Sequence, residues 1–339
     1  MALMPTAARS QPDETGPHAE LIRRALVQND TGALTEVISL GPAVAGELGS
    51  YLGHHDYNVR TRALEALCRI PEAAPGALEQ ALRSADQSLK AYALACAEPF
   101  IADARVREAW LDCFAEPLEQ TNGHENAYHT LIHLPAELRI PMGQALVPKI
   151  LPSLDRFDGL RLVIMLQVIG QFATSGDQPA LRRLAELRRL AESNAPELWR
   201  SRRDPEYEER IRQRLIAVVD FAEANLGDDR AFQRFASRAL AGERAARAER
   251  LELLPKLRPT PKALELAGQL LRDRVPLKDV SISHSTQVDY KHACDFAVDA
   301  LGEWFPDFPF RTAFYRVYVD DQLNQAREWL QAHHAAGER

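Results

Sequence analysis

Apolar residues recur along most of this chain at the spacing of an amphipathic helix. The stretch 52–71 shows the pattern clearly. Its apolar residues lie three, four or seven positions apart and share one helix face: Val59, Ala63, Leu64, Leu67 and Ile70. Arg62, Glu65 and Arg69 fall on the opposite face. Pro71 cannot continue the backbone hydrogen bonds, so we expect this helix to end there.

The same spacing predicts helices through the rest of the chain. The segments are 19–29, 42–52, 82–101, 124–135, 156–172, 178–199, 201–229, 230–257, 261–274 and 288–305, followed by a last helix capped by Asp320 or Asp321. A short β-prone or irregular patch is expected within 275–287. The pattern therefore predicts an all-α protein.

Several of these segments resemble one another at regular offsets. Shifting 52–71 by 30 residues places Asp86 under Asp56 and Ala93 under Ala63, and a shift of 64 places Ala127 there. Four anchor positions follow one another at separations of 30, 34 and 37 residues: Arg60, Lys90, His124 and Arg161. Such periods are typical of paired-helix repeats.

The stretch from Asp56 through Val59-Arg60 to Leu67 resembles the second helix of a HEAT repeat of the short bacterial kind, in which an aspartate turn precedes Val-Arg and small apolar residues. The copies at 52–71 and 82–101 match best, and those at 124–135 and 156–172 are degenerate. The resemblance implies an α-solenoid of helical hairpins. The aromatic residues near the end of the chain are then expected to form an aromatic-rich C-terminal helical cap.

The predicted organisation has four parts. Residues 1–18 read as a flexible leader, 19–172 as HEAT-like repeats, 173–280 as longer helical hairpins and 281–339 as the C-terminal helical cap. In the repeats, Asp56 and Asp86 are expected to cap helices. Arg60 and Lys90 are expected to reach acidic or carbonyl groups of a neighbouring repeat.

Composition narrows the classes of partner. The formal net charge of −7 argues against general affinity for nucleic acid or an anionic membrane. No run approaches the roughly 20 apolar residues that a membrane span needs. The first residues lack the features of a secretion signal, so we expect a cytoplasmic protein. The four cysteines, Cys68, Cys96, Cys113 and Cys294, form no metal-binding spacing and are expected to be reduced and buried.

The histidine-rich stretch 124–133 is the first candidate for chemistry. His129 and His133 share one side of a helix and could seat a metal, but Glu125 does not complete a metalloprotease motif. Iron-binding enzymes of HEAT-like architecture use several His-Glu pairs, and this chain has only His124-Glu125. We expect His129 and His133 to face solvent or a partner, with no metal and no cofactor.

Three other groups were weighed. Asp289, His292, Asp295 and Asp299 follow helical spacing, and a helix cap or an ion pair between His292 and Asp295 is preferred to catalysis. Ser283, His284 and Ser285 lack the sharp turn that presents a nucleophile. Trp199, Arg200, Arg202 and Arg203 precede four acidic residues, which favours a mixed charged loop over a phosphate-binding site.

The sequence favours a non-enzymatic protein-binding scaffold, either an adaptor or an immunity protein that occludes a partner protein. Arg62, Glu65, Arg69, His129 and His133 are the candidate contact residues, because they lie opposite the predicted core face. The alternative is a HEAT-like enzyme such as a DNA-alkylation glycosylase, which would need a basic groove. A relative of the chromophore lyases is a third possibility. The identity of the partner and the oligomeric state are left open.

Overall fold

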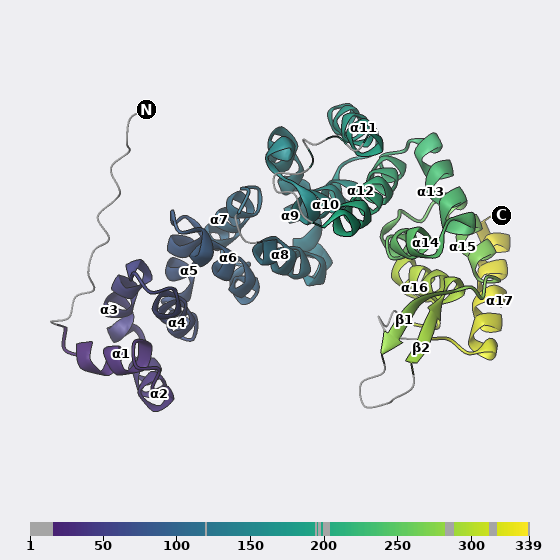
Figure 1. Cartoon of the computed structure of the whole chain (residues 1–339). Coiled ribbons are helices and arrows are strands. Elements are labelled where there is room, and N and C mark those ends of the chain that lie inside the picture. The colour runs from purple at the N-terminus through teal and green to yellow at the C-terminus, as the bar shows by residue number, and fades with distance from the viewer. Residues whose placement is uncertain are drawn as a thin grey trace. The chain divides into compact units, whose positions relative to one another are not determined.

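The computed structural model describes residues 16–118, 121–193, 195, 198, 204–281, 288–311 and 317–337. Helices make up most of the described residues, and two strands form a small antiparallel sheet (Figure 1). The predicted helical class is therefore confirmed, with one β-hairpin added. Contacts divide the chain into two compact units, one ending at Phe157 and the other beginning at Asp158. Most of the predicted leader, residues 1–15, lies outside the described residues.

The first unit contains nine helices among its described residues. They are α1 (Ala19–Leu26), α2 (Thr31–Ser39), α3 (Ala45–Ser50), α4 (Tyr57–Cys68), α5 (Ala74–Leu82), α6 (Gln87–Cys96), α7 (Ala104–Phe114), α8 (Thr121–His133) and α9 (Ala136–Ile150). Short 3₁₀ turns lie at Gly41–Val44, Tyr51–Gly53, Glu98–Phe100 and Leu151–Arg156.

Helices α4 to α9 pack in two rows (Figure 1). Helix α4 contacts α6, and α6 contacts α8; likewise α5 contacts α7, and α7 contacts α9. Each row also packs on the other through α4 with α5, α5 with α6, α6 with α7, and α8 with α9. Small residues permit this close packing: Ala63, Ala93 and Ala127 are fully buried at equivalent positions of α4, α6 and α8.

Aspartates fix where many of these helices begin. The carboxylate of Asp56 accepts a hydrogen bond from the backbone N–H of Asn58 at 2.8 Å, and that of Asp86 accepts from Ser88 and Leu89 at 2.9 and 3.0 Å. Both predicted caps are confirmed. Asp30 and Asp103 cap α2 and α7 in the same way. Each cap satisfies amide groups that the first turn of a helix leaves without a partner.

The second unit is also built mainly from helices. Those described are α10 (Gly159–Phe172), α11 (Gln178–Glu192), α12 (Pro205–Asn225), α13 (Asp229–Ala241), α14 (Arg244–Leu251), α15 (Pro261–Leu270), α16 (Ala293–Trp304) and α17 (Asp320–Gly337). A 3₁₀ turn lies at Leu254–Lys256, and strands β1 (Pro276–Ser281) and β2 (Val288–His292) form the antiparallel sheet.

Helix α12 is the centre of the first half of this unit, since it packs against α10, α11, α13 and α14. A nearly unbroken run of its residues is buried, from Leu215 to Glu223. Gly170 of α10 lets the two helices approach closely: a Cβ atom there would lie 2.9 Å from the Cα of Ala222. Asn225 joins the end of α12 to α10 and to the 3₁₀ turn at Leu254–Lys256, because its side-chain amide donates to the carbonyls of Gly170 and Lys256 at 3.0 and 3.1 Å.

Two predicted helices are interrupted. The segment 230–257, expected as one helix, divides into α13 and α14, because Gly242 adopts an extended conformation between them. The helix expected over 288–305 begins only at Ala293, because residues 288–292 pair with β1. Asp320 and Asp321 lie inside the first turn of α17, where their charges favour the helix N-terminus without capping it.

Aromatic rings near the end of the chain gather in one group. The ring of Trp329 on α17 lies 5.2 Å from that of Phe305 and 5.0 Å from that of Phe308, centroid to centroid. Phe310 extends the group from Phe308 to Tyr318. Phe314 and Tyr315 lie outside the described residues. None of the described helices is both long enough and apolar enough to cross a membrane.

Candidate functional site

The predicted anchor residues have structural roles. Arg60 is buried, and its Nε lies 2.8 Å from the Asp86 carboxylate that caps the next segment's helix. Its Nη1 also donates to the carbonyls of His54 and His55 at 2.7 and 2.8 Å. Lys90 is likewise buried and forms an ion pair with Glu116. The predicted reach of Arg60 and Lys90 to acidic or carbonyl groups is therefore confirmed.

His124 occupies the next anchor position and is fully buried. Its Nε2 lies 2.9 Å from the carbonyl oxygen of Glu116, and its ring meets those of Phe114 and Phe157 edge to face. The three anchors thus place different basic side chains in the same structural role. This environment holds His124 in the core of the first unit.

The candidate contact residues of α4 differ in solvent exposure and in the contacts that they make within the protein. Glu65 and Arg69 form a half-exposed ion pair at 3.0 Å along one helix turn. Arg62 is only half-buried, and its Nη1 donates to the carbonyl of Leu26 at 2.9 Å, which ties α4 to α1. Arg62 therefore also serves packing, whereas Glu65 and Arg69 remain accessible at the surface.

On α8, His129 and His133 are both exposed, as expected, and their rings stack with centroids 5.6 Å apart. The repeat offset places His129 at the position of Glu65 and His133 at that of Arg69. Within the described part of the chain, no group of three or more His, Cys, Asp or Glu side chains is arranged to hold a metal ion.

Helix α6, which packs between α4 and α8, carries one further residue of this surface that was not predicted from the sequence. Tyr92 occupies the position equivalent to Arg62 and is half-buried. Burial raises the pKa of its hydroxyl, with Cys96 and Glu65 adding to the effect. We call the surface formed by Glu65, Arg69, Tyr92, His129 and His133 the α4–α6–α8 face. The 30-residue offset that relates Asp56 to Asp86 also places Tyr92 at the position of Arg62, so the sequence contains a signal for it.

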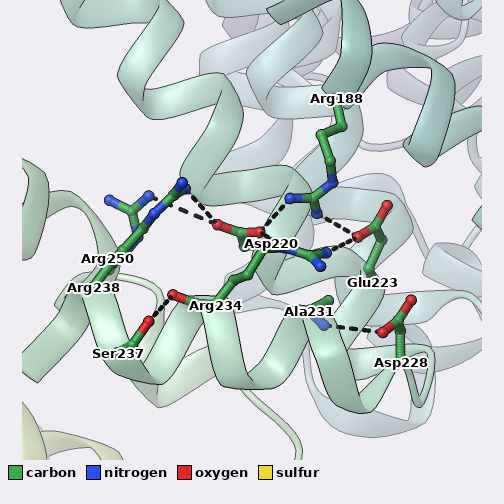
Figure 2. Close-up of polar contacts among 9 residues, drawn as sticks. All are labelled: Arg188, Asp220, Glu223, Asp228, Ala231, Arg234, Ser237, Arg238 and Arg250. Carbon is green, nitrogen blue, oxygen red and sulfur yellow. Dashed lines mark hydrogen bonds and ion pairs between the residues drawn. The ribbon is translucent and has the colours of Figure 1, made fainter. Parts of the chain in front are cut away.

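The second unit holds a buried ionic cluster centred on Asp220 of α12 (Figure 2). Arg188 of α11 and Arg234 of α13 each bridge Asp220 to Glu223: Arg188 Nη1 and Arg234 Nε lie 2.6 and 3.0 Å from Asp220 Oδ1. The other ends of both guanidinium groups contact Glu223 Oε2, at 2.9 Å for Arg234. Burial raises the pKa of Glu223.

Two more arginines approach Asp220 from its other oxygen. Arg238 Nη1 and Arg250 Nη2 lie 3.3 and 3.7 Å from Asp220 Oδ2. Arg250 is fully buried, and its Nη1 donates to the carbonyl of Ala246 at 2.9 Å. Burial lowers the pKa of Arg250, against the attraction of Asp220. None of the residues of this cluster was among the sites predicted from the sequence.

The acidic residues near the end of the chain form a second polar network. Asp295 accepts from the backbone N–H of His292 at 2.7 Å and of Tyr318 at 3.0 Å, completing a capping box with His292. The preferred structural role of the His292–Asp295 pair is confirmed. Asp299 pairs with Lys291 and accepts from the Tyr318 hydroxyl at 2.9 Å, all three being buried. Burial raises the pKa of Asp299.

Several candidates fall where the structure gives no description. The described residues do not include Ser283, His284, Ser285, Trp199, Arg200, Arg202 and Arg203, nor the side chain of Asp289.

All four cysteines are free thiols. Cys113 and Cys294 are buried as predicted, but Cys68 and Cys96 are only half-buried.

Comparison with known proteins adds no assignment. No protein-family model matches the chain. No curated protein matches it significantly either.

Proposed function

We propose that the chain is a HEAT-like repeat protein that acts as a non-enzymatic scaffold, an adaptor or immunity protein, and binds a partner protein on the α4–α6–α8 face. Helix α4 packs on α6 and α6 packs on α8, so alternate helices along the chain are in contact, and this supports a repeating arrangement. The buried anchors Arg60, Lys90 and His124 support it too, because each joins its helix to a neighbouring segment or turn.

One observation carries the choice of face. Equivalent positions of α4 and α8 carry accessible polar side chains, while the opposite sides of the same helices are buried. Glu65 with Arg69 and His129 with His133 can offer charge and hydrogen bonds in register along the row. A rigid row of this kind fits an extended protein surface, since stacked helices present side chains at fixed intervals.

The test is a quantitative pull-down with the full chain from extract of the organism that encodes it. The wild type is compared with E65R and with the double variant H129E/H133E. We expect one protein to be captured in stoichiometric amount by the wild type, and its affinity to fall at least about tenfold in both variants, as for residues near an interface centre.

The matched control is E108R, which reverses the charge of an exposed residue on α7, in the other row. It should capture the partner as the wild type does. Equal capture by all four proteins would place the interface elsewhere, and a wild type with no stoichiometric partner would refute the scaffold function.

A further inference from the structure

The ionic cluster around Asp220 in the second unit contains more positive than negative side chains. Four guanidinium groups surround two carboxylates. Arg188 and Arg234 make both ion-pair contacts to Glu223 Oε2 and both contacts to Asp220 Oδ1. Figure 2 shows Glu223 and Asp228 on one side of Asp220, with Arg238 and Arg250 on the other. Asp228 is engaged in capping α13 through the backbone N–H of Ala231 at 2.9 Å.

The excess positive charge lies at Arg238 and Arg250. Both contact Asp220 Oδ2, at 3.3 and 3.7 Å, and the longer distance exceeds that of a good charge-assisted hydrogen bond. Glu249 is a second carboxylate that favours the charged form of Arg250. The Nε of Arg250 is buried and has no hydrogen-bond partner among the described residues. A buried guanidinium with an unsatisfied donor is costly unless a counter-charge lies nearby.

This side of the cluster is open to solvent. The side chain of Arg250 is 1% exposed, but that of Arg238 is 44% exposed and that of Arg234 is 34% exposed. Arg230, also exposed, precedes these two at four-residue steps on α13. The three arginines therefore lie along one face of the helix, with the buried charge of Arg250 behind Arg238.

We propose that the Arg238 side of this cluster binds a tetrahedral oxyanion of the phosphate class, with Arg238 making the direct contact and Arg234 adding positive charge nearby. Guanidinium groups suit this ligand because their planar donors match paired phosphate oxygens. Arg250 supplies a second positive charge that water screens little, since its side chain is buried. The proposal is independent of the α4–α6–α8 face and goes beyond a scaffold function.

Isothermal titration calorimetry of the full chain with inorganic phosphate tests the site, with ionic strength held constant by chloride to remove general screening. We expect the wild type to bind with a dissociation constant on the order of 1 mM or tighter. R238Q should weaken binding about tenfold or more, as expected for loss of a charge-assisted contact. R250M should weaken binding several-fold, because it removes the buried positive charge behind Arg238.

R272Q is the matched control, because Arg272 is exposed after α15 and outside the cluster; it should bind phosphate as the wild type does. A second titration uses O-phosphoserine. If it binds as tightly as phosphate, the ligand is a phosphoryl group on a larger molecule; if only phosphate binds, the ligand is the free ion. The proposal is overturned if the wild type binds no phosphate, if acetate binds equally, or if R238Q binds unchanged. R238Q alters an exposed side chain, so it decides the matter even if R250M does not fold.

Discussion

At the scale of single residues, buried basic side chains explain how neighbouring helices are joined. Arg60 contacts a carboxylate 26 residues away and two carbonyls of the preceding turn. We expect R60M to lower the free energy of unfolding by about 2–4 kcal/mol, because Asp86 and both carbonyls lose a charged donor. Chemical denaturation followed by circular dichroism measures the change.

The control for R60M lies on the same helix. Arg69 pairs with Glu65 in an exposed i, i+4 geometry. Such pairs contribute little, so R69M should change stability by less than about 0.5 kcal/mol. Equal losses in the two variants would mean that burial of Arg60 has no special importance.

The thiols also allow a prediction at this scale. Burial raises the pKa of Cys113 to about 12 and that of Cys294 to about 11. A raised thiol pKa leaves less of the reactive thiolate at pH 8. We expect both to react with Ellman's reagent only after unfolding. Rapid labelling of either in native protein, located by mass spectrometry, would contradict this.

At the scale of elements, the contact of α10 with α12 depends on Gly170. A Cβ atom there would lie 2.5 Å from a ring carbon of Phe221 and 2.9 Å from the Cα of Ala222. We expect G170A to cost about 1–3 kcal/mol of stability, because backbone cannot move aside as a flexible side chain does. Thermal unfolding measures the effect.

Gly76 offers the opposite case within helix α5. A Cβ atom there would meet nothing within 4 Å. G76A should therefore stabilise the protein by up to about 1 kcal/mol, since alanine favours helix. Stabilisation by both substitutions would show that α10 and α12 are farther apart than described.

The elements also show what local pattern can predict. Asp56 and Asp86 were predicted as caps because the cap signal lies within three residues of the helix it begins. Residues 288–292 were predicted as helix, yet they form a strand. Their state is set by pairing with Pro276–Ser281, a contact that local periodicity does not contain.

At the scale of the whole molecule, distance along the chain decides what sequence reasoning finds. His129 and His133 were placed on one face because they are four residues apart. The Asp220 cluster contains Arg188, Arg234 and Arg250, which span more than 60 residues of sequence, so no short motif predicts it. Charged residues within apolar runs were its only signal: Asp220 and Glu223 lie in the most hydrophobic part of α12.

The division into two compact units predicts how a local defect spreads. Leu64 in α4 and Leu166 in α10 are both fully buried, one in each unit. L64A and L166A should each cost about 2–5 kcal/mol by leaving a cavity. Helices here contact mainly their near neighbours, so each loss should loosen its own unit before the other. Hydrogen exchange with mass spectrometry should show faster exchange in α3 to α6 for L64A and in α10 to α12 for L166A. Faster exchange of all helices to the same degree in both variants would instead require the chain to unfold as one cooperative body.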